Sequence, residues 1–85
     1  MEFVASPEFL EVYRILDDST AECVDEAIRR VLVQPESAWA RQNRVLGELG
    51  SSWLVALNCQ GNDLSLYWRQ TEGAEVIELL LLLRR

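Results

Sequence analysis

Apolar residues recur at intervals of three and four positions in the first part of the chain, which is typical of amphipathic helices. Two such stretches are present: Phe9, Val12, Tyr13 and Leu16, then Val24, Ala27, Ile28, Val31 and Leu32. Ser6 followed by Pro7 and an acid has the form of a helix start. Residues 19–22 read as a capping box, and Pro35 ends the second stretch. The sequence therefore predicts helices over residues 7–16 and 20–33.

From residue 53 onward the spacing changes to alternation, which predicts strands. Trp53, Val55 and Leu57 fall on one face of the first strand, and Leu54 and Ala56 fall on the other. The predicted strands are 53–59, 64–70 and 75–83, with turns at 60–63 and 71–73 and a loop at 36–46. A short strand at 2–5 precedes the helices. We expect an α+β fold of order β-α-α-β-β-β, with a two-helix hairpin packed on one face of a small antiparallel sheet.

The 85 residues are enough for one domain spanning 1–85, and 49% of them are hydrophobic. The leucines at 79–83 are too few to cross a bilayer, so no membrane association is expected. The first residues are acidic and lack a long apolar segment, so we expect no secretory signal and a cytoplasmic location. Cys23 and Cys59 could form one disulfide in an oxidising compartment, but in the cytoplasm we expect two reduced core residues.

Acidic residues outnumber basic ones, 14 to 8, giving a net charge of −6. Residues 1–36 hold nine acids and three arginines, whereas residues 37–85 hold five of each, so the excess acid lies on the predicted helices. Most nucleic-acid affinity comes from neutralising phosphates. This balance argues against strong nonspecific RNA or DNA binding and leaves room only for a local arginine patch in the second half.

The chain contains no histidine, which removes the commonest general base and metal ligand. Two separated cysteines cannot make a zinc cluster, and the acid pairs at 17–18 and 25–26 are typical of a solvated helix face. No glycine-rich phosphate loop or nucleophile elbow is present. We therefore expect neither a metal nor a cofactor.

Several features together resemble one known family. They are Ser6-Pro-Glu-Phe9, the helix end at Gln34-Pro35, the step Arg44-Val-Leu-Gly47, Trp53 on the next strand, and an apolar last strand ending in Arg84-Arg85. From Phe3 to Arg85 this pattern resembles the RelE/ParE superfamily, the bacterial toxins of toxin–antitoxin pairs. The resemblance implies an antitoxin partner. RelE-like members cleave mRNA on the ribosome without a metal, using arginines and lysines on the open sheet face to stabilise the developing charge.

The sequence departs from that pattern at the basic positions. Leu54 and Ala56 stand where the open face would carry lysines, and Asn62-Asp63 stands where a Tyr-Arg pair would open the next strand. The remaining candidates for catalytic charge are all arginines: Arg41, Arg44, Arg69, and Arg84 or Arg85. Each has a plain alternative as a surface arginine paired with a carboxylate.

The same substitutions make the face opposite the helices apolar. We expect partner binding there through Leu54, Ala56, Tyr67, Leu80 and Leu82. An apolar sheet face is usually covered. The cover could be an antitoxin segment, a second copy in a homodimer, or the chain's own loop 36–46 or N-terminal residues.

Two functions follow from the resemblance and the departures. One is a toxin of the mRNA-interferase lineage, a metal-independent endoribonuclease with weak or lost activity, for which the ribosome and mRNA would be partners. The other is a non-catalytic binding protein, either a ParE-like inhibitor of a protein target or a silent complex-forming relative. A nuclease needs positive charges on the open face to bind phosphate, whereas a non-catalytic binding protein does not. The few basic residues there favour the binder.

Overall fold

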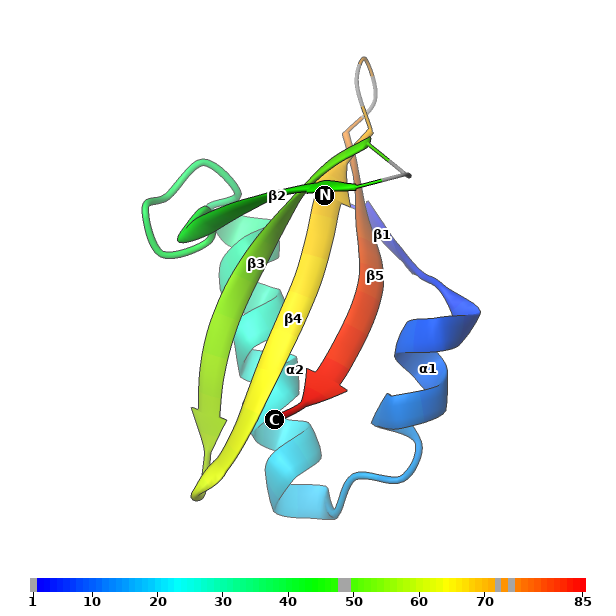
Figure 1. Cartoon of the computed structure of the whole chain (residues 1–85), viewed down its shortest axis with the longest axis vertical. Helices are drawn as coiled ribbons and strands as arrows, with labels where there is room; N and C mark the ends of the chain where they lie inside the picture. Colours follow the sequence, from blue (N-terminus) through cyan, green and yellow to red (C-terminus); the bar gives the residue numbers. More distant parts are fainter. Residues whose placement is uncertain (1, 48–49, 72, 74) are drawn as a thin grey trace.

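This computed structural model describes residues 2–47, 50–71, 73 and 75–85, which form two helices and five strands. In chain order the elements are β1 (Glu2–Ala5), α1 (Pro7–Tyr13), α2 (Asp18–Val33), β2 (Asn43–Gly47), β3 (Gly50–Cys59), β4 (Asn62–Gln70) and β5 (Val76–Arg84). The strands make one sheet in the order β1-β5-β4-β3-β2 (Figure 1). The predicted α+β class is confirmed. The predicted turn at 71–73 includes Glu72, which lies outside the described residues.

The sheet is mixed, because β1 runs parallel to β5 while the other pairs are antiparallel. Phe3 lies beside Ile77, and Ser6 continues the pairing by donating its backbone N–H to the Leu79 carbonyl at 2.9 Å. The Ser6 hydroxyl donates to the Leu80 carbonyl. The first residues of the chain are thus fixed to its last strand before α1 begins.

Strand β2 was not predicted, because residues 36–46 read as a loop. It is an edge strand paired with β3, with Arg44 opposite Trp53. All but Val45 of its five residues are exposed, so neither face leaves an apolar stripe in the sequence. Polar and apolar residues alternate in the sequence of a strand only when one of its faces is buried, and β2 buries neither face.

The helix starts follow local capping, with one correction. Ser6 caps α1 as predicted, accepting from the Phe9 N–H at 3.2 Å. Helix α2 is capped by Asp17 rather than Ser19: an Asp17 carboxylate oxygen accepts from the Thr20 N–H at 2.8 Å. Hydrogen bonding to the Thr20 side chain first, and to its backbone N–H second, holds the pKa of Asp17 below its usual range. The helix therefore begins earlier than the capping box at 19–22 predicted.

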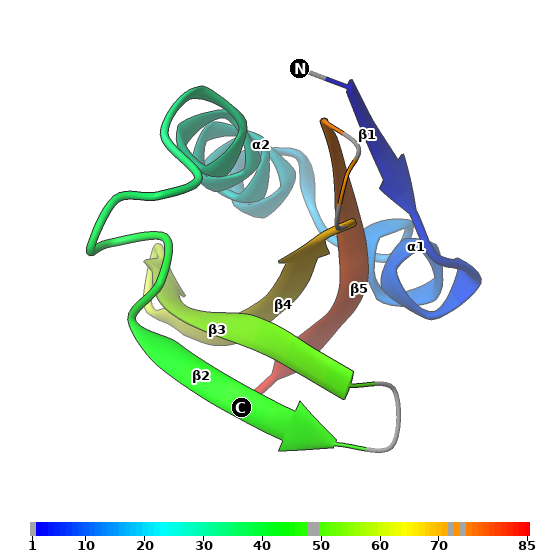
Figure 2. The same cartoon turned by 90° about the horizontal axis from the view of Figure 1, so that it is seen from above.

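The two helices occupy different places along the sheet. Helix α2 lies behind the sheet in Figure 1 and contacts β3, whereas α1 lies beside β5 and contacts it. Seen from above in Figure 2, the sheet curves from β2 to β1. The Tyr13 hydroxyl joins the helices by donating to Asp25 at 2.7 Å. Within the described residues, neither helix combines the length and apolar character that crossing a membrane requires.

The core lies between the sheet and the helices. Its fully buried large side chains come mostly from the inner faces of the three central strands and from α2: Trp68, Leu64, Leu66, Ile77, Leu79, Leu82, Val24, Val31 and Val55. The buried Trp68 indole N–H donates to the Ala40 carbonyl at 2.9 Å. This bond satisfies the polar atom of the largest core residue and fixes the loop between α2 and β2 against the sheet.

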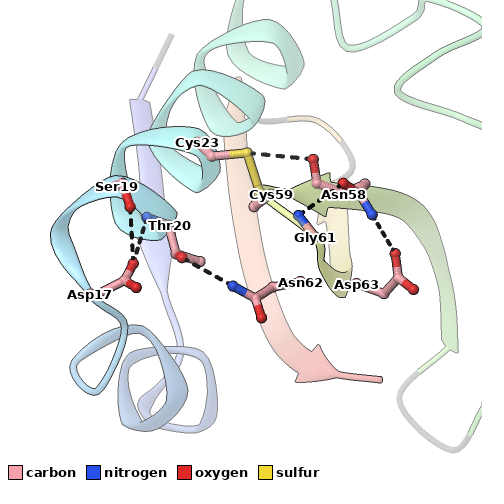
Figure 3. Close-up of a disulfide and its surroundings, with 9 residues drawn as sticks. All are labelled: Asp17, Ser19, Thr20, Cys23, Asn58, Cys59, Gly61, Asn62 and Asp63. Atoms are coloured by element: carbon pink, nitrogen blue, oxygen red, sulfur yellow. Dashed lines mark hydrogen bonds between the residues drawn. A yellow bond between two sulfur atoms is a disulfide. The ribbon is translucent and has the colours of Figure 1, made fainter.

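Cys23 and Cys59 form a disulfide, so the expectation of two reduced cysteines is wrong for this structure (Figure 3). Their Cα atoms are 5.7 Å apart, and the bond spans 36 residues of sequence. The helical spacing of α2 and the alternation of β3 turn both residues toward the same layer. The expectation considered only the redox state of the compartment. The bond forms because α2 packs directly on β3, which brings the two cysteines together.

Candidate functional site

The face of the sheet opposite the helices is apolar across its three central strands. Residues directly opposite one another on β3, β4 and β5 form two rows, which we call the apolar band: Leu54–Tyr67–Leu81 and Ala56–Ser65–Leu83. The alternate residues of the same strands, such as Val55 and Leu66, are fully buried toward the helices. Strand alternation therefore turns the band away from them.

The band remains partly open to solvent. Leu83 is 41% exposed, Leu54, Tyr67 and Leu81 are half-buried, and Ala56 is exposed. Neighbouring side chains across strands shield one another, since directly opposed residues lie about 5 Å apart. The structure thus places Leu54, Ala56 and Tyr67 on the open face, where the sequence predicted them. Their binding role stays a prediction.

A bulge on β5 changes the predicted leucines. Trp68 lies opposite Leu79 while Tyr67 lies opposite Leu81, so Leu80 is an extra residue without a partner on β4. One extra residue shifts the alternation of every residue that follows. As a result Leu82, predicted on the open face, is fully buried in the core. Leu80 itself is half-buried at the bulge.

An ion pair closes one end of the apolar band. Arg69 lies opposite Glu78, next to Tyr67, and its Nε is 2.6 Å from a Glu78 carboxylate oxygen. The Thr71 hydroxyl donates to the other oxygen at 2.7 Å. These two hydrogen bonds, that of Thr71 first, lower the pKa of Glu78. Arg69 is therefore on the open face as predicted, but its charge is engaged by a carboxylate.

The other end of the band is polar and acidic. Asn58 lies opposite Asp63, and its side-chain amide donates to the Asp63 carboxylate at 2.8 Å. The Arg85 backbone N–H donates to the Asp63 carbonyl at 2.8 Å, which places Arg85 at this end. Asp63 and Arg69 are six positions apart on β4, a span of about 20 Å at the usual strand rise. Arg69 and Arg85 thus mark opposite ends of the band.

Arg41 and Arg44 belong to the other face of the sheet. Arg44 pairs with Trp53 and donates its Nε to the Ser51 hydroxyl at 2.9 Å. The Arg41 guanidinium lies 5.0 Å from the Trp53 ring, and its Nε donates to the Pro35 carbonyl at 2.9 Å. Both contacts are on the side of β3 that faces the helices. Neither arginine shares a surface with Arg69.

Beside the Arg41–Trp53 contact lies a shallow polar hollow of about 400 Å³. Its lining comes from the loop before β2, from β3, and from the end of β4 and the segment that follows it: Arg41, Ser51, Trp53, Gln70, Thr71, Gly73 and Glu75. Sequence reasoning missed this hollow. It depends on Arg41 in the loop before β2, and this loop gives no periodic signal.

The arrangement limits the chemistry that the chain can do. The four candidate arginines Arg41, Arg44, Arg69 and Arg85 are spread over both faces and both ends of the sheet instead of meeting at one point. The sequence has no histidine, and no group of three or more potential metal ligands occurs among the described residues. The feature that the residues do assemble is the apolar band.

The arrangement of two helices on a five-stranded mixed sheet is similar to that in a solved toxin–antitoxin complex. A search of solved structures gives a chain from the "Crystal structure of the intact E. coli RelBE toxin-antitoxin complex", with a TM-score of 0.73 and 16% identity. The alignment covers 95% of this chain and 92% of that one. No protein-family model and no curated protein matches the sequence. The RelE-like fold implied by the resemblance is confirmed, and at this identity the likeness shows the fold alone.

Proposed function

We propose that this protein is the toxin-like component of a toxin–antitoxin pair, that it binds its antitoxin through the apolar band, and that it cleaves RNA weakly or not at all. The observation that carries the proposal is the band itself. A sheet face that carries apolar side chains in place of a cluster of positive charges is suited to contact another protein. The RelE-like fold supports the choice of an antitoxin as that protein.

The size of the band favours a wrapping partner over a second copy. Fully burying a large apolar side chain is worth about 1.5–3 kcal/mol, and the half-buried Leu54, Tyr67 and Leu81 contribute less than that each. Association costs about 4–15 kcal/mol in lost freedom. A flat contact between two copies of the band would barely meet this cost. An extended segment that covers the band and continues over neighbouring surface buries more area.

The arginine positions support weak or absent catalysis. Stabilising the charge that develops at phosphorus takes several groups around one point, and removing a single donor typically costs 100-fold to 1,000-fold in rate. Here Arg69 is bound to Glu78, and Arg41 and Arg44 contact the other face. With a net charge of −6 the chain also lacks the general attraction that would hold RNA.

The proposal is tested by co-expressing the chain with any short protein encoded next to it and purifying through a tag on the chain. The expected result is a stable complex, together with little growth arrest when the chain is expressed alone. Co-purification that survives Leu54→Asp would place the partner elsewhere on the surface. A monomer that retains no neighbour-encoded protein would overturn the toxin–antitoxin proposal.

A further inference from the structure

The disulfide lies where the first half of α2 meets the end of β3. Figure 3 shows Cys23 on the helix and Cys59 just before the turn at Gln60–Gly61, with the sulfur–sulfur bond between them. The two residues differ in burial: Cys59 is 0% exposed within the core, whereas Cys23 is only partly buried. The partners of this bond therefore differ in how far a reagent from solvent can reach them.

We propose that Cys23 is a thiol-exchange site, at which a low-molecular-weight thiol opens the disulfide, and that Cys59 is the resolving thiol. A thiolate attacks Cys23 Sγ and forms a mixed disulfide, and the bond to Cys59 breaks with Cys59 leaving as thiolate. A second thiolate then attacks the sulfur of the added thiol, releasing the small-molecule disulfide and Cys23 thiolate. Two electrons pass from two thiols to the protein, and both cysteines end as thiols after protonation.

The direction of attack follows from burial. Exchange needs access of the attacking thiolate to one sulfur, and the core side chains around Cys59 block that approach. The apolar surroundings of Cys59 also disfavour its thiolate, so opening should be slow. In the mixed disulfide, Cys59 remains next to Cys23, with Cα atoms 5.7 Å apart in the closed form. Attack by Cys59 on Cys23 then closes the bond again and expels the added thiol.

Opening the bond should loosen one end of the molecule. A long hydrogen bond joins α2 to the start of β4: the Asn62 side-chain amide donates to the Thr20 hydroxyl at 3.5 Å. The β3–β4 turn holds Gln60 and Gly61 at positive φ, 55° and 85°. The far end is held separately by the Trp68 bond to Ala40. Reduction should therefore act on residues 17–24 and 57–64 and spare β2. This chemistry is independent of the partner-binding role proposed above.

Two single-cysteine variants test the direction of exchange. Cys59→Ser leaves Cys23 alone, and Cys23→Ser leaves Cys59 alone. Each is treated with 2-hydroxyethyl disulfide, a neutral reagent that the acidic outer surface of α2 does not repel, and adducts are followed by intact mass. We expect Cys59→Ser to be modified about tenfold faster, because its thiol is the accessible one. Equal rates, or faster modification of Cys23→Ser, would overturn the assignment.

A second measurement uses the wild-type chain and does not depend on the variants folding. The oxidised protein is treated with 2-mercaptoethanol, quenched with acid at early times and mapped by mass spectrometry. We expect the added thiol on Cys23 with Cys59 free, and hydrogen exchange that rises first at residues 17–24 and 57–64. An adduct on Cys59, or exchange that rises equally in β2, would show that the bond opens by global unfolding instead.

Discussion

Leu54 and Tyr67 lie directly opposite one another on β3 and β4, on the face of the sheet that the helices leave uncovered, and Tyr67 in turn lies opposite Leu81 on β5. This row of the apolar band is therefore apolar on all three strands. Along the strands, the Arg69–Glu78 ion pair lies at one end of the band, and the Asn58–Asp63 hydrogen bond lies at the other. A strip of apolar side chains bounded by satisfied polar groups has the composition of an interface core with a polar rim.

The bulge at Leu80 predicts opposite outcomes for two adjacent leucines. Leu82→Ala removes a fully buried side chain and should lower the free energy of unfolding by about 2–5 kcal/mol. Leu83→Ala removes a side chain that is 41% exposed on the apolar band and should cost about 1 kcal/mol or less. Urea denaturation of both variants measures the difference. A larger loss for Leu83→Ala than for Leu82→Ala would mean that the alternation of β5 continues through Leu80 without a shift.

Much of the fold could be predicted from periodicity. The positions of Leu54, Ala56 and Tyr67 followed from the two-residue period of a strand, which puts every second residue of β3 and of β4 on the same face. The same rule failed on β5. Residues 79–83 are all leucine, so nothing in the sequence marks which of them face the core, and a bulge within such a run leaves no trace.

The features that the sequence did not predict depend on contacts between distant segments. Strand β2 forms because the chain returns along β3, although its own residues bury neither face. The cysteine pair depends on how α2 packs on β3. The separation of the candidate arginines depends on β2 and on the loop before it, which place Arg44 and Arg41. Local pattern carries no information on any of these.

The Asp17 cap predicts a dependence of stability on acid pH. The pKa of Asp17 is lowered in the folded state, chiefly by hydrogen bonding to the Thr20 side chain and then to its backbone. The ionised cap therefore stabilises the fold fully above the unfolded pKa of about 4, and this stabilisation is lost as pH falls through the folded-state pKa. Asp17→Asn keeps a capping side chain without the titration. We expect its Tm to fall less steeply than that of the wild type below about pH 4–5.

Asp18→Asn is the matched control for that prediction, because Asp18 lies in the first turn of α2 and is not its cap. Thermal melts between about pH 2 and 7 compare the three proteins. Glu78 has a lowered pKa as well and titrates with the same sign in all of them. If Asp17→Asn and Asp18→Asn change the pH profile equally, the effect comes from net charge rather than from the cap.

The disulfide predicts a large thermal difference between the oxidised and reduced forms. Closing a 36-residue loop is worth about 4 kcal/mol in the chain-entropy treatment, and engineered bonds often deliver less. For a domain of this size the Tm should therefore fall by roughly 10–20 °C on reduction. Calorimetry with and without dithiothreitol measures the shift. The Cys23→Ser/Cys59→Ser protein is the control and should not respond to the reductant.

The dispersed arginines predict weak RNA cleavage. With ribosomes programmed with mRNA, the chain should cleave at least about 100-fold more slowly than a RelE-like toxin that carries its full set of basic residues, because among the described residues no group of positive charges surrounds a single point on the open face. Arg41→Ala and Arg44→Ala should leave any residual rate unchanged, since both residues contact the other face. Codon-dependent cleavage at a comparable rate, abolished by Arg85→Ala, would contradict this account.

If the apolar band is a protein-binding surface, an added charge should weaken binding when it lies on the band and not when it lies elsewhere, and titration calorimetry of the partner against three charge variants measures this. Leu54→Asp puts an unpaired charge at the centre of the band, whereas Leu46→Asp puts the same charge on a 75% exposed leucine of β2 that belongs to the other face. Ala56→Asp, at an exposed position of the band, repeats the test with less risk to folding. We expect Leu54→Asp and Ala56→Asp to weaken binding at least about 100-fold, an effect of roughly 3 kcal/mol, and Leu46→Asp to bind like the wild type. Folded band variants that bind as tightly as Leu46→Asp would contradict it.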